Sequence, residues 1–226
     1  MEQPINIPSS GWKNYTLLNF SPVVRWLIIS DFLLLGGFGL IGPIFAIFIT
    51  NNVTGANLQT AGIAASIYLL TKSLGQIPVA SLLDKIKGEI DDFWALFLGM
   101  FMMSIIPLAY IFASTPGWLY LIQFIYGLAA AFVFPAYMAI FTRHVDKDKE
   151  GLAWGTYFTF TDLGAAGAGA IGGTLAQYIG FQSLFIVVSG FSLLSTLCLL
   201  AIKSHLRHHL RHEIINEKLT IKKTAN

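Results

Sequence analysis

Six long apolar runs separated by short polar gaps dominate this sequence. They cover residues 24–49, 60–83, 93–114, 117–142, 152–179 and 182–202. A helix of about 20 apolar residues crosses a bilayer, so each run is long enough for one crossing. The chain is 55% hydrophobic and only 12% charged, an apolar excess too large for one soluble core. The sequence therefore predicts an all-α membrane protein with six transmembrane helices.

Basic residues divide the gaps into two kinds that alternate along the chain. The gaps NNVTGANLQ, STPG and YIGFQ contain no Lys or Arg, whereas DKIKGEIDD, TRHVDKDKEG and the tail contain most of them. Because basic loops remain in the cytoplasm, we expect both termini there. This divides the chain into a cytoplasmic N-terminal segment (1–23), a membrane domain (24–202) and a basic cytoplasmic tail (203–226).

Composition and motifs also exclude several functions. The net charge of +2 is too small to indicate a nucleic-acid partner. No Gly-x-Ser-x-Gly or His-Glu-x-x-His pattern occurs in the apolar runs, so we do not expect an enzyme. We expect no cofactor and no metal site.

The two halves of the membrane domain resemble each other. GPIFAIFIT in the first run matches FPAYMAIFT in the fourth, and YLLTKSLG in the second matches YFTFTDLG in the fifth. The matched runs would cross the membrane in opposite directions. The sequence therefore predicts a three-plus-three inverted repeat, which many secondary transporters have.

Three degenerate motifs make the chain resemble one half of a major facilitator superfamily transporter over about residues 24–202. ASLLDKIKGE retains Asp84 and Lys85 of the family's loop motif, which become candidates for a gating loop. QFIYG has Gln123 where the family often has arginine. GAAGAGAIGG retains three glycines of the antiporter-type motif, Gly164, Gly172 and Gly173, but has Ala168 and Gly169 in place of its Gly-Pro pair. The resemblance implies a small-molecule substrate and alternating access in a lipid bilayer, and we expect that of a bacterial inner membrane.

The family's usual chain has twelve spans in two related halves, and this one has six. We expect a homodimer, in which the second and fifth spans of one protomer meet the fifth and second of its partner. Met1 and the absence of a seventh apolar run favour a natural half-length protein. Two alternatives stay open: the N-terminal half of a twelve-span transporter, and a non-transporting assembly subunit that pairs with another half.

Three charged residues lie deep within the apolar runs. Lys72 and Asp162 have opposite signs and similar predicted depths, near the middle of the bilayer. A charge at that depth is costly and is a functional candidate. We expect Lys72 of one protomer to pair with Asp162 of the other; an intrachain pair, or a Lys72 that lines a wet cavity and contacts substrate, are the alternatives.

Asp31 in the first run is the third charged residue. By resemblance to proton-driven members of the family, it is the candidate proton-coupling residue, with the proton as the coupling ion. The alternative is a carboxylate near the cytoplasmic rim, hydrated or paired with Arg25.

The remaining candidates are uncharged. Gln76, Gln123, Tyr68 and Tyr126 are candidates for lining the substrate cavity, although interhelical packing explains such residues equally well. Small residues in the fifth run form a face on which two helices can approach closely. These candidate helix-interface residues are Gly164, Ala168 and Gly172.

Overall fold

The structure, a computed structural model, describes residues 17–86 and 88–224, and this part of the chain contains helices and no strand. Residues 1–16 of the expected N-terminal segment lie outside the described residues. The elements are η2 (Leu17–Asn19), α1 (Pro22–Gly39), η3 (Gly42–Ile44), α2 (Phe45–Asn52), α3 (Leu58–Ile86), α4 (Glu89–Ile111), α5 (Pro116–His144) and α6 (Glu150–Thr224).

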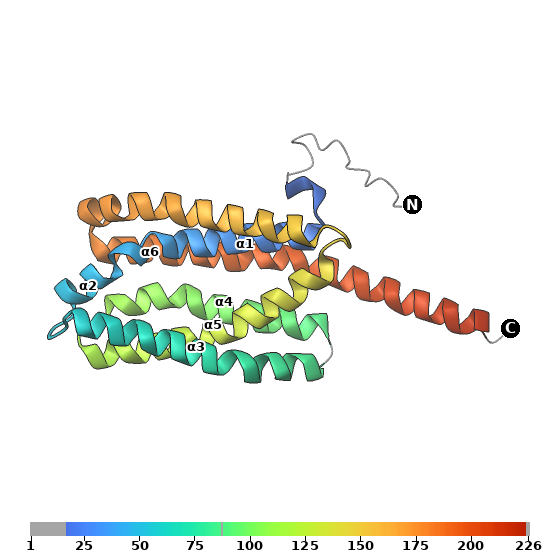
Figure 1. Cartoon of the computed structure of the whole chain (residues 1–226), viewed down its shortest axis with the longest axis horizontal. Coiled ribbons are helices and arrows are strands. Elements are labelled where there is room, and N and C mark those ends of the chain that lie inside the picture. The colour runs from blue at the N-terminus through green and yellow to red at the C-terminus, as the bar shows by residue number, and fades with distance from the viewer. Residues whose placement is uncertain (1–16, 87, 225–226) are drawn as a thin grey trace, which may run out of the picture.

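The helices form one elongated bundle (Figure 1). Helix α2 continues in the direction of α1, and α3, α4, α5 and the start of α6 then alternate in direction. The connections at 53–57 and 112–115 lie at one end of the bundle, beside α2. The starts of α1 and α4, the end of α3 and the connection at 145–149 lie at the other end. The basic gaps of the sequence are therefore gathered at one end of the molecule, and the gaps without Lys or Arg at the other.

Helix α6 contains a sharp reversal at Gly180. Its backbone angles there are φ 76° and ψ 164°, a left-handed region that favours glycine. The first arm of α6, residues 150–179, and the second arm, residues 181–224, therefore run antiparallel along the bundle (Figure 1). They contain the fifth and sixth apolar runs. The second arm continues beyond the bundle, through the expected tail.

Within the described residues, four helical stretches are long and apolar enough to cross a membrane. They are Pro22–Asn52, Glu89–Ile111, Pro116–His144 and Glu150–Leu206, the last of which includes both arms of α6. Helix α3 is 29 residues long but is not among them, because Lys72 and Gln76 lower its hydropathy. The prediction of an all-helical multi-pass membrane protein is confirmed at this level.

Small residues allow the closest helix contacts of the bundle. A methyl group added to Gly172 on α6 would lie 1.9 Å from the carbonyl oxygen of Leu40, beyond the end of α1. A methyl group on Gly127 of α5 would lie 2.6 Å from the carbonyl oxygen of Tyr68 on α3. Two such crossings, α1 with α6 and α3 with α5, therefore depend on glycine, while α4 packs between α5 and α6.

Hydroxyl groups join the helices at the centre of the bundle. Ser189 on the second arm of α6 donates to the carbonyl oxygen of Ser104 on α4 at 2.6 Å. The Ser104 and Thr196 hydroxyls lie 3.1 Å apart, and Ser195 donates to the carbonyl oxygen of Ser30 on α1. All these groups are buried, and their pairing removes the cost of burying free polar atoms.

Candidate functional site

A buried carboxylate lies where α1, α5 and α6 meet. Asp31 is only 7% exposed, and the Tyr157 hydroxyl on the first arm of α6 donates to its Oδ2 at 2.7 Å. The ring of Tyr137 on α5 lies 5.4 Å from that of Tyr157. The Tyr137 hydroxyl is buried and has no hydrogen-bond partner among the described residues. This cluster can hold a proton at Asp31 while Tyr157 supports the ionised form.

An aromatic cavity of about 240 Å³ is lined by α1, the η3 turn, the start of α2, α3, α4 and α5. Its aromatic lining residues are Phe38, Phe45, Tyr68, Tyr110 and Tyr126. Three candidates from the sequence, Tyr68, Tyr126 and Gln123, meet in this lining. None of the residues described there carries a charge. The cavity is suited to an uncharged ring-bearing molecule, because its walls offer ring faces rather than ions.

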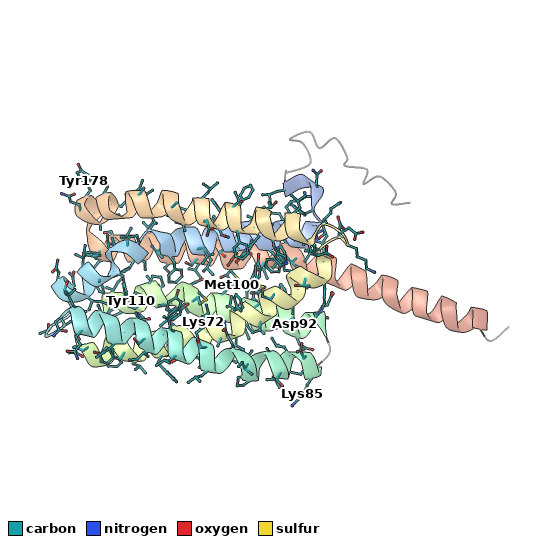
Figure 2. The ribbon with its side chains drawn as sticks, in the orientation of Figure 1. Lys72, Lys85, Asp92, Met100, Tyr110 and Tyr178 are labelled. Carbon is teal, nitrogen blue, oxygen red and sulfur yellow. The ribbon has the colours of Figure 1, made fainter. Side chains whose placement is uncertain are left out.

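The rings of this cavity are arranged in two groups. Tyr126 lies between Phe38 and Tyr68, with ring centroids 5.2 Å and 4.4 Å away and ring planes nearly parallel to both. Phe45 and Tyr110 form the other group, with centroids 4.8 Å apart. Figure 2 shows Tyr110 on the side of Lys72 away from Lys85 and Asp92. The cavity therefore belongs to the part of the bundle away from the basic end.

Gln123 supplies the polar group of this cavity. Its side chain is 4% exposed, and its Oε1 has no hydrogen-bond partner among the described residues. A buried acceptor without a partner is unfavourable unless a ligand or water donates to it. Gln76, the other glutamine singled out in the sequence, is half-buried on α3 and does not line the cavity.

A larger cavity of about 370 Å³ lies between α1 and the two arms of α6. Its lining consists of glycines and apolar side chains, including Phe32 and Phe191. It offers no polar group to orient a ligand, so the aromatic cavity is the stronger candidate site despite its smaller volume.

Lys72 and Asp162 lie on different helices and do not meet. Lys72 is the central residue of α3 and is half-buried, with its Nζ 5.4 Å from the centre of the Phe134 ring (Figure 2). Asp162 is exposed on the first arm of α6. No ion pair joins them in the part of the chain that the structure describes. The intrachain pair considered from the sequence is therefore not formed.

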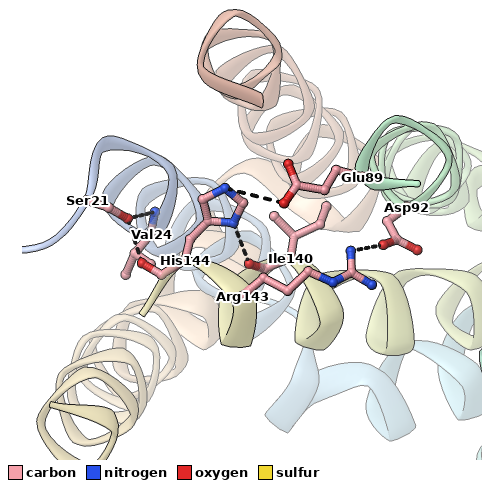
Figure 3. Close-up of polar contacts among 7 residues, drawn as sticks. All are labelled: Ser21, Val24, Glu89, Asp92, Ile140, Arg143 and His144. Carbon is pink, nitrogen blue, oxygen red and sulfur yellow. Dashed lines mark hydrogen bonds and ion pairs between the residues drawn. The ribbon is translucent and has the colours of Figure 1, made fainter. Parts of the chain in front are cut away.

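The basic end of the bundle contains an ion-pair cluster that the sequence reasoning missed (Figure 3). Arg143 near the end of α5 pairs with the buried Asp92 of α4. His144 Nε2 lies 3.8 Å from Glu89 Oε1, and Ser21, which caps α1, donates to the His144 carbonyl oxygen at 2.9 Å. Acids in the first turn of one helix and bases in the last turn of another are the signal that was available.

The other sequence candidates lie as follows. Asp84 and Lys85 are exposed near the end of α3. Gly164 and Gly172 face α1 of the same chain, and added methyl groups would clash with Phe32 and Leu40. Ala168 touches the same helix through Gly39. The predicted small-residue face is therefore a contact within the bundle.

Comparison with known proteins agrees with this architecture. The family model of the Major Facilitator Superfamily matches residues 27–222. The multi-drug resistance efflux pump PmrA of Streptococcus pneumoniae serotype 4 is 27% identical over 187 residues, which are 80% of this chain and 45% of the pump. The PmrA homolog of Lactococcus lactis subsp. lactis is 26% identical over 176 residues, 77% of this chain and 42% of that protein.

A bundle of membrane-length helices defines a multi-pass membrane protein. The family match makes this specific: the chain belongs to the Major Facilitator Superfamily, a group of transporters and not of enzymes. The resemblance stated from the sequence motifs is confirmed. The chain spans less than half the length of the curated relatives that it matches.

Proposed function

We propose that this chain is a six-span half-bundle of a secondary active transporter. It moves a small solute by alternating access, is coupled to protons through Asp31, and works as a homodimer in a bacterial inner membrane with both termini in the cytoplasm. The observation that carries the proposal is the uncharged cavity and the buried acid within one bundle of this family.

The packing of the helices supports a three-plus-three repeat of six crossings. In such a repeat, α1 corresponds to α5, and the first arm of α6 corresponds to α3. The α1–α6 contact therefore corresponds to the α5–α3 contact, and both contacts are extensive. Gly39 of α1 packs on Ala165, and Ala131 of α5 packs on Gly75. The spacing between Gly39 and Ala131 equals that between Pro43 and Pro135, the prolines of the matched sequence segments. Gly39 and Ala131 therefore have corresponding positions in the two segments.

The positions of the half-buried Lys72 and the exposed Asp162 support association of two copies. In Figure 1, α3 and the first arm of α6 lie on opposite sides of the bundle. A two-fold axis would place α3 of each copy against the first arm of α6 of its partner. Each Lys72 would then pair with an Asp162 of the other copy. Leu69, Leu74 and Ile77 extend the exposed apolar surface of α3. Such an ion pair would specify the partner more than it would stabilise the complex.

The buried Asp31–Tyr157 contact supports proton coupling. An acid removed from water can gain and lose a proton as the transporter changes state, and intramembrane acids commonly form proton relays. The relatives' names support drug-like solutes and export as the direction. Export of the fluorescent three-ring compound β-carboline from vesicles, driven by an imposed pH gradient and compared with vesicles that lack the protein, measures this activity directly.

The protein mass of the purified complex in lipid nanodiscs tests the assembly. Wild type is compared with Lys72→Asp, Asp162→Lys and the doubly exchanged variant. We expect a dimer for wild type, monomers for both single variants, and a restored dimer for the double exchange. A monomeric wild type would contradict the homodimer and would instead favour a second half supplied by a different polypeptide or by more of the same chain.

A further inference from the structure

We propose that the aromatic cavity binds an uncharged, flat molecule of two or three fused rings that donates a hydrogen bond to Gln123. This substrate class deepens the proposed function and rests on it for the ligand's role as transported solute. The binding site itself is assigned from the cavity residues alone.

The arrangement of the rings selects a flat ligand. Phe38, Tyr126 and Tyr68 form a continuous stack along one wall, while Phe45 and Tyr110 lie along another. Aromatic rings prefer offset-stacked or edge-to-face neighbours, and walls of this kind provide both geometries. The volume of about 240 Å³ is below that of sites for most drug-sized ligands, which limits the ligand to a few rings.

The buried Gln123 oxygen selects a hydrogen-bond donor. It is the oxygen of a side chain that is nearly fully buried, and no described residue donates to it. A ligand N–H or O–H satisfies this acceptor, whereas a ligand without a donor leaves it unpaired and loses binding free energy. The cavity therefore distinguishes a donor from its methylated analogue.

The charges around the cavity select an uncharged ligand. The described lining residues include neither an acid to balance a cation nor a base to balance an anion. Lys72 follows Tyr68 by one helical turn on α3, and its ammonium group, directed at the Phe134 ring, disfavours a cation nearby. A buried charge without a partner is strongly unfavourable.

The repeat gives an independent argument for the donor. Asp31 and Gln123 are separated by as many residues as Pro43 and Pro135, and Tyr157 aligns with Tyr68 in the matched YFTFTDLG and YLLTKSLG segments. In the acid site, the Tyr157 hydroxyl donates to Asp31. In the cavity, no residue that the structure describes donates to the corresponding acceptor on Gln123. The ligand would supply the hydrogen bond that Tyr157 supplies in the other repeat.

Equilibrium binding of two fluorescent probes to the full chain in lipid nanodiscs tests this assignment. The probes are β-carboline, which has three fused rings and one indole N–H, and its N9-methyl derivative, which lacks the donor; both are measured at an alkaline pH that keeps their pyridine nitrogen uncharged. Empty nanodiscs measure partition into lipid. Wild type should bind β-carboline about 10-fold more tightly than the methylated probe, as expected for one hydrogen bond to a buried acceptor.

Three variants locate the site. Gln123→Leu removes the acceptor and should abolish the preference for β-carboline, whereas Gln76→Leu makes the same change outside the cavity and should retain it. Tyr126→Leu removes the centre of the ring stack and should weaken both probes. Thermal unfolding of each variant shows whether it is folded, and the wild-type comparison of the two probes needs no variant.

Two results would overturn the site: equal affinity of wild type for both probes, or a preference that survives in Gln123→Leu. The second would show that the methyl group only clashes with the protein. Binding does not depend on transport. A preference for β-carboline over its N9-methyl derivative without export of β-carboline would therefore refute the proposed function and leave the site in place. Export with equal affinities for the two probes would refute the site and leave the proposed function in place.

Discussion

The contact of α1 with α6 and the contact of α3 with α5 share an arrangement of residues but differ in their polar groups. Each contact depends on glycine at a close crossing, and each places a polar residue of one helix near an aligned tyrosine of the other. In the first contact, Asp31 is an acid to which Tyr157 donates. In the second, Gln123 and Tyr68 line an open cavity.

Under the proposed function, this difference would give the two sites different roles. The acid site is filled by the protein's own hydroxyl group, and it can exchange nothing larger than a proton without rearrangement. The glutamine site has the matching position in the sequence, but no described residue donates to its acceptor, and an open cavity lies beside it. One site would then serve the coupling ion, and the other the solute.

The largest effect should come from filling the α1–α6 crossing. Gly172→Ala would bring a methyl group 1.9 Å from a backbone oxygen, which cannot move aside as a flexible side chain could. We expect a loss of about 3 kcal/mol or more in stability, measured by thermal unfolding in detergent. Gly173→Ala is the matched control, because its nearest neighbour would be an ordinary contact at 3.8 Å.

The same comparison extends to the second contact. Gly127→Ala would approach the Tyr68 carbonyl oxygen to 2.6 Å, so it should also destabilise the bundle, though by less than Gly172→Ala. Equal stability of Gly172→Ala and Gly173→Ala would contradict the close crossing and with it the shared arrangement of the two contacts.

Removing the acid should have the next largest effect, on function rather than on folding. Asp31→Asn keeps the shape and a hydrogen-bond acceptor for Tyr157 but cannot carry a proton. We expect β-carboline export driven by a pH gradient to fall about 100-fold, on the order of the contribution of a positioned acid–base group. Exchange of β-carboline at equal pH is the control and should persist. Export that remains coupled to the gradient would show that Asp31 is not the coupling residue.

The smallest effect separates two neighbouring tyrosines. Tyr157→Phe removes a hydrogen bond to a carboxyl group and should cost about 2 kcal/mol of stability. Tyr137→Phe removes a buried hydroxyl that has no described partner and should be neutral or slightly stabilising. The unfolding temperatures of the two variants test this ranking, and the reverse order would mean that Tyr137 is the main hydrogen-bond donor to Asp31.

Much of the fold was predictable because lipid restricts the alternatives. In a bilayer every backbone polar group must be paired within the segment, so long apolar runs predict helices without further information. The six runs correspond to helical stretches of the bundle, with the first broken at Gly42–Ile44 and the last two joined through Gly180. The family, too, followed from short motifs with a fixed order and spacing.

The sites were only partly predictable. Polar residues in apolar runs attract attention because they are costly there, which is why Asp31, Gln123 and Lys72 were identified from the sequence. Cost alone does not reveal a partner. Asp92 and Arg143 were missed because, at predicted helix ends, they resemble ordinary solvated charges, and the structure buries Asp92 almost completely.

The sequence by itself determined which segments are apolar, where the basic residues gather, and which family the chain belongs to, since these depend on composition and on order along the chain. Only the tertiary structure decided that Gln123 shares a cavity with Tyr68 and Tyr126 while Gln76 does not, and that Asp31 meets Tyr157. Those outcomes depend on how helices distant in the sequence rotate and cross, which is decided by side-chain packing at the glycine contacts.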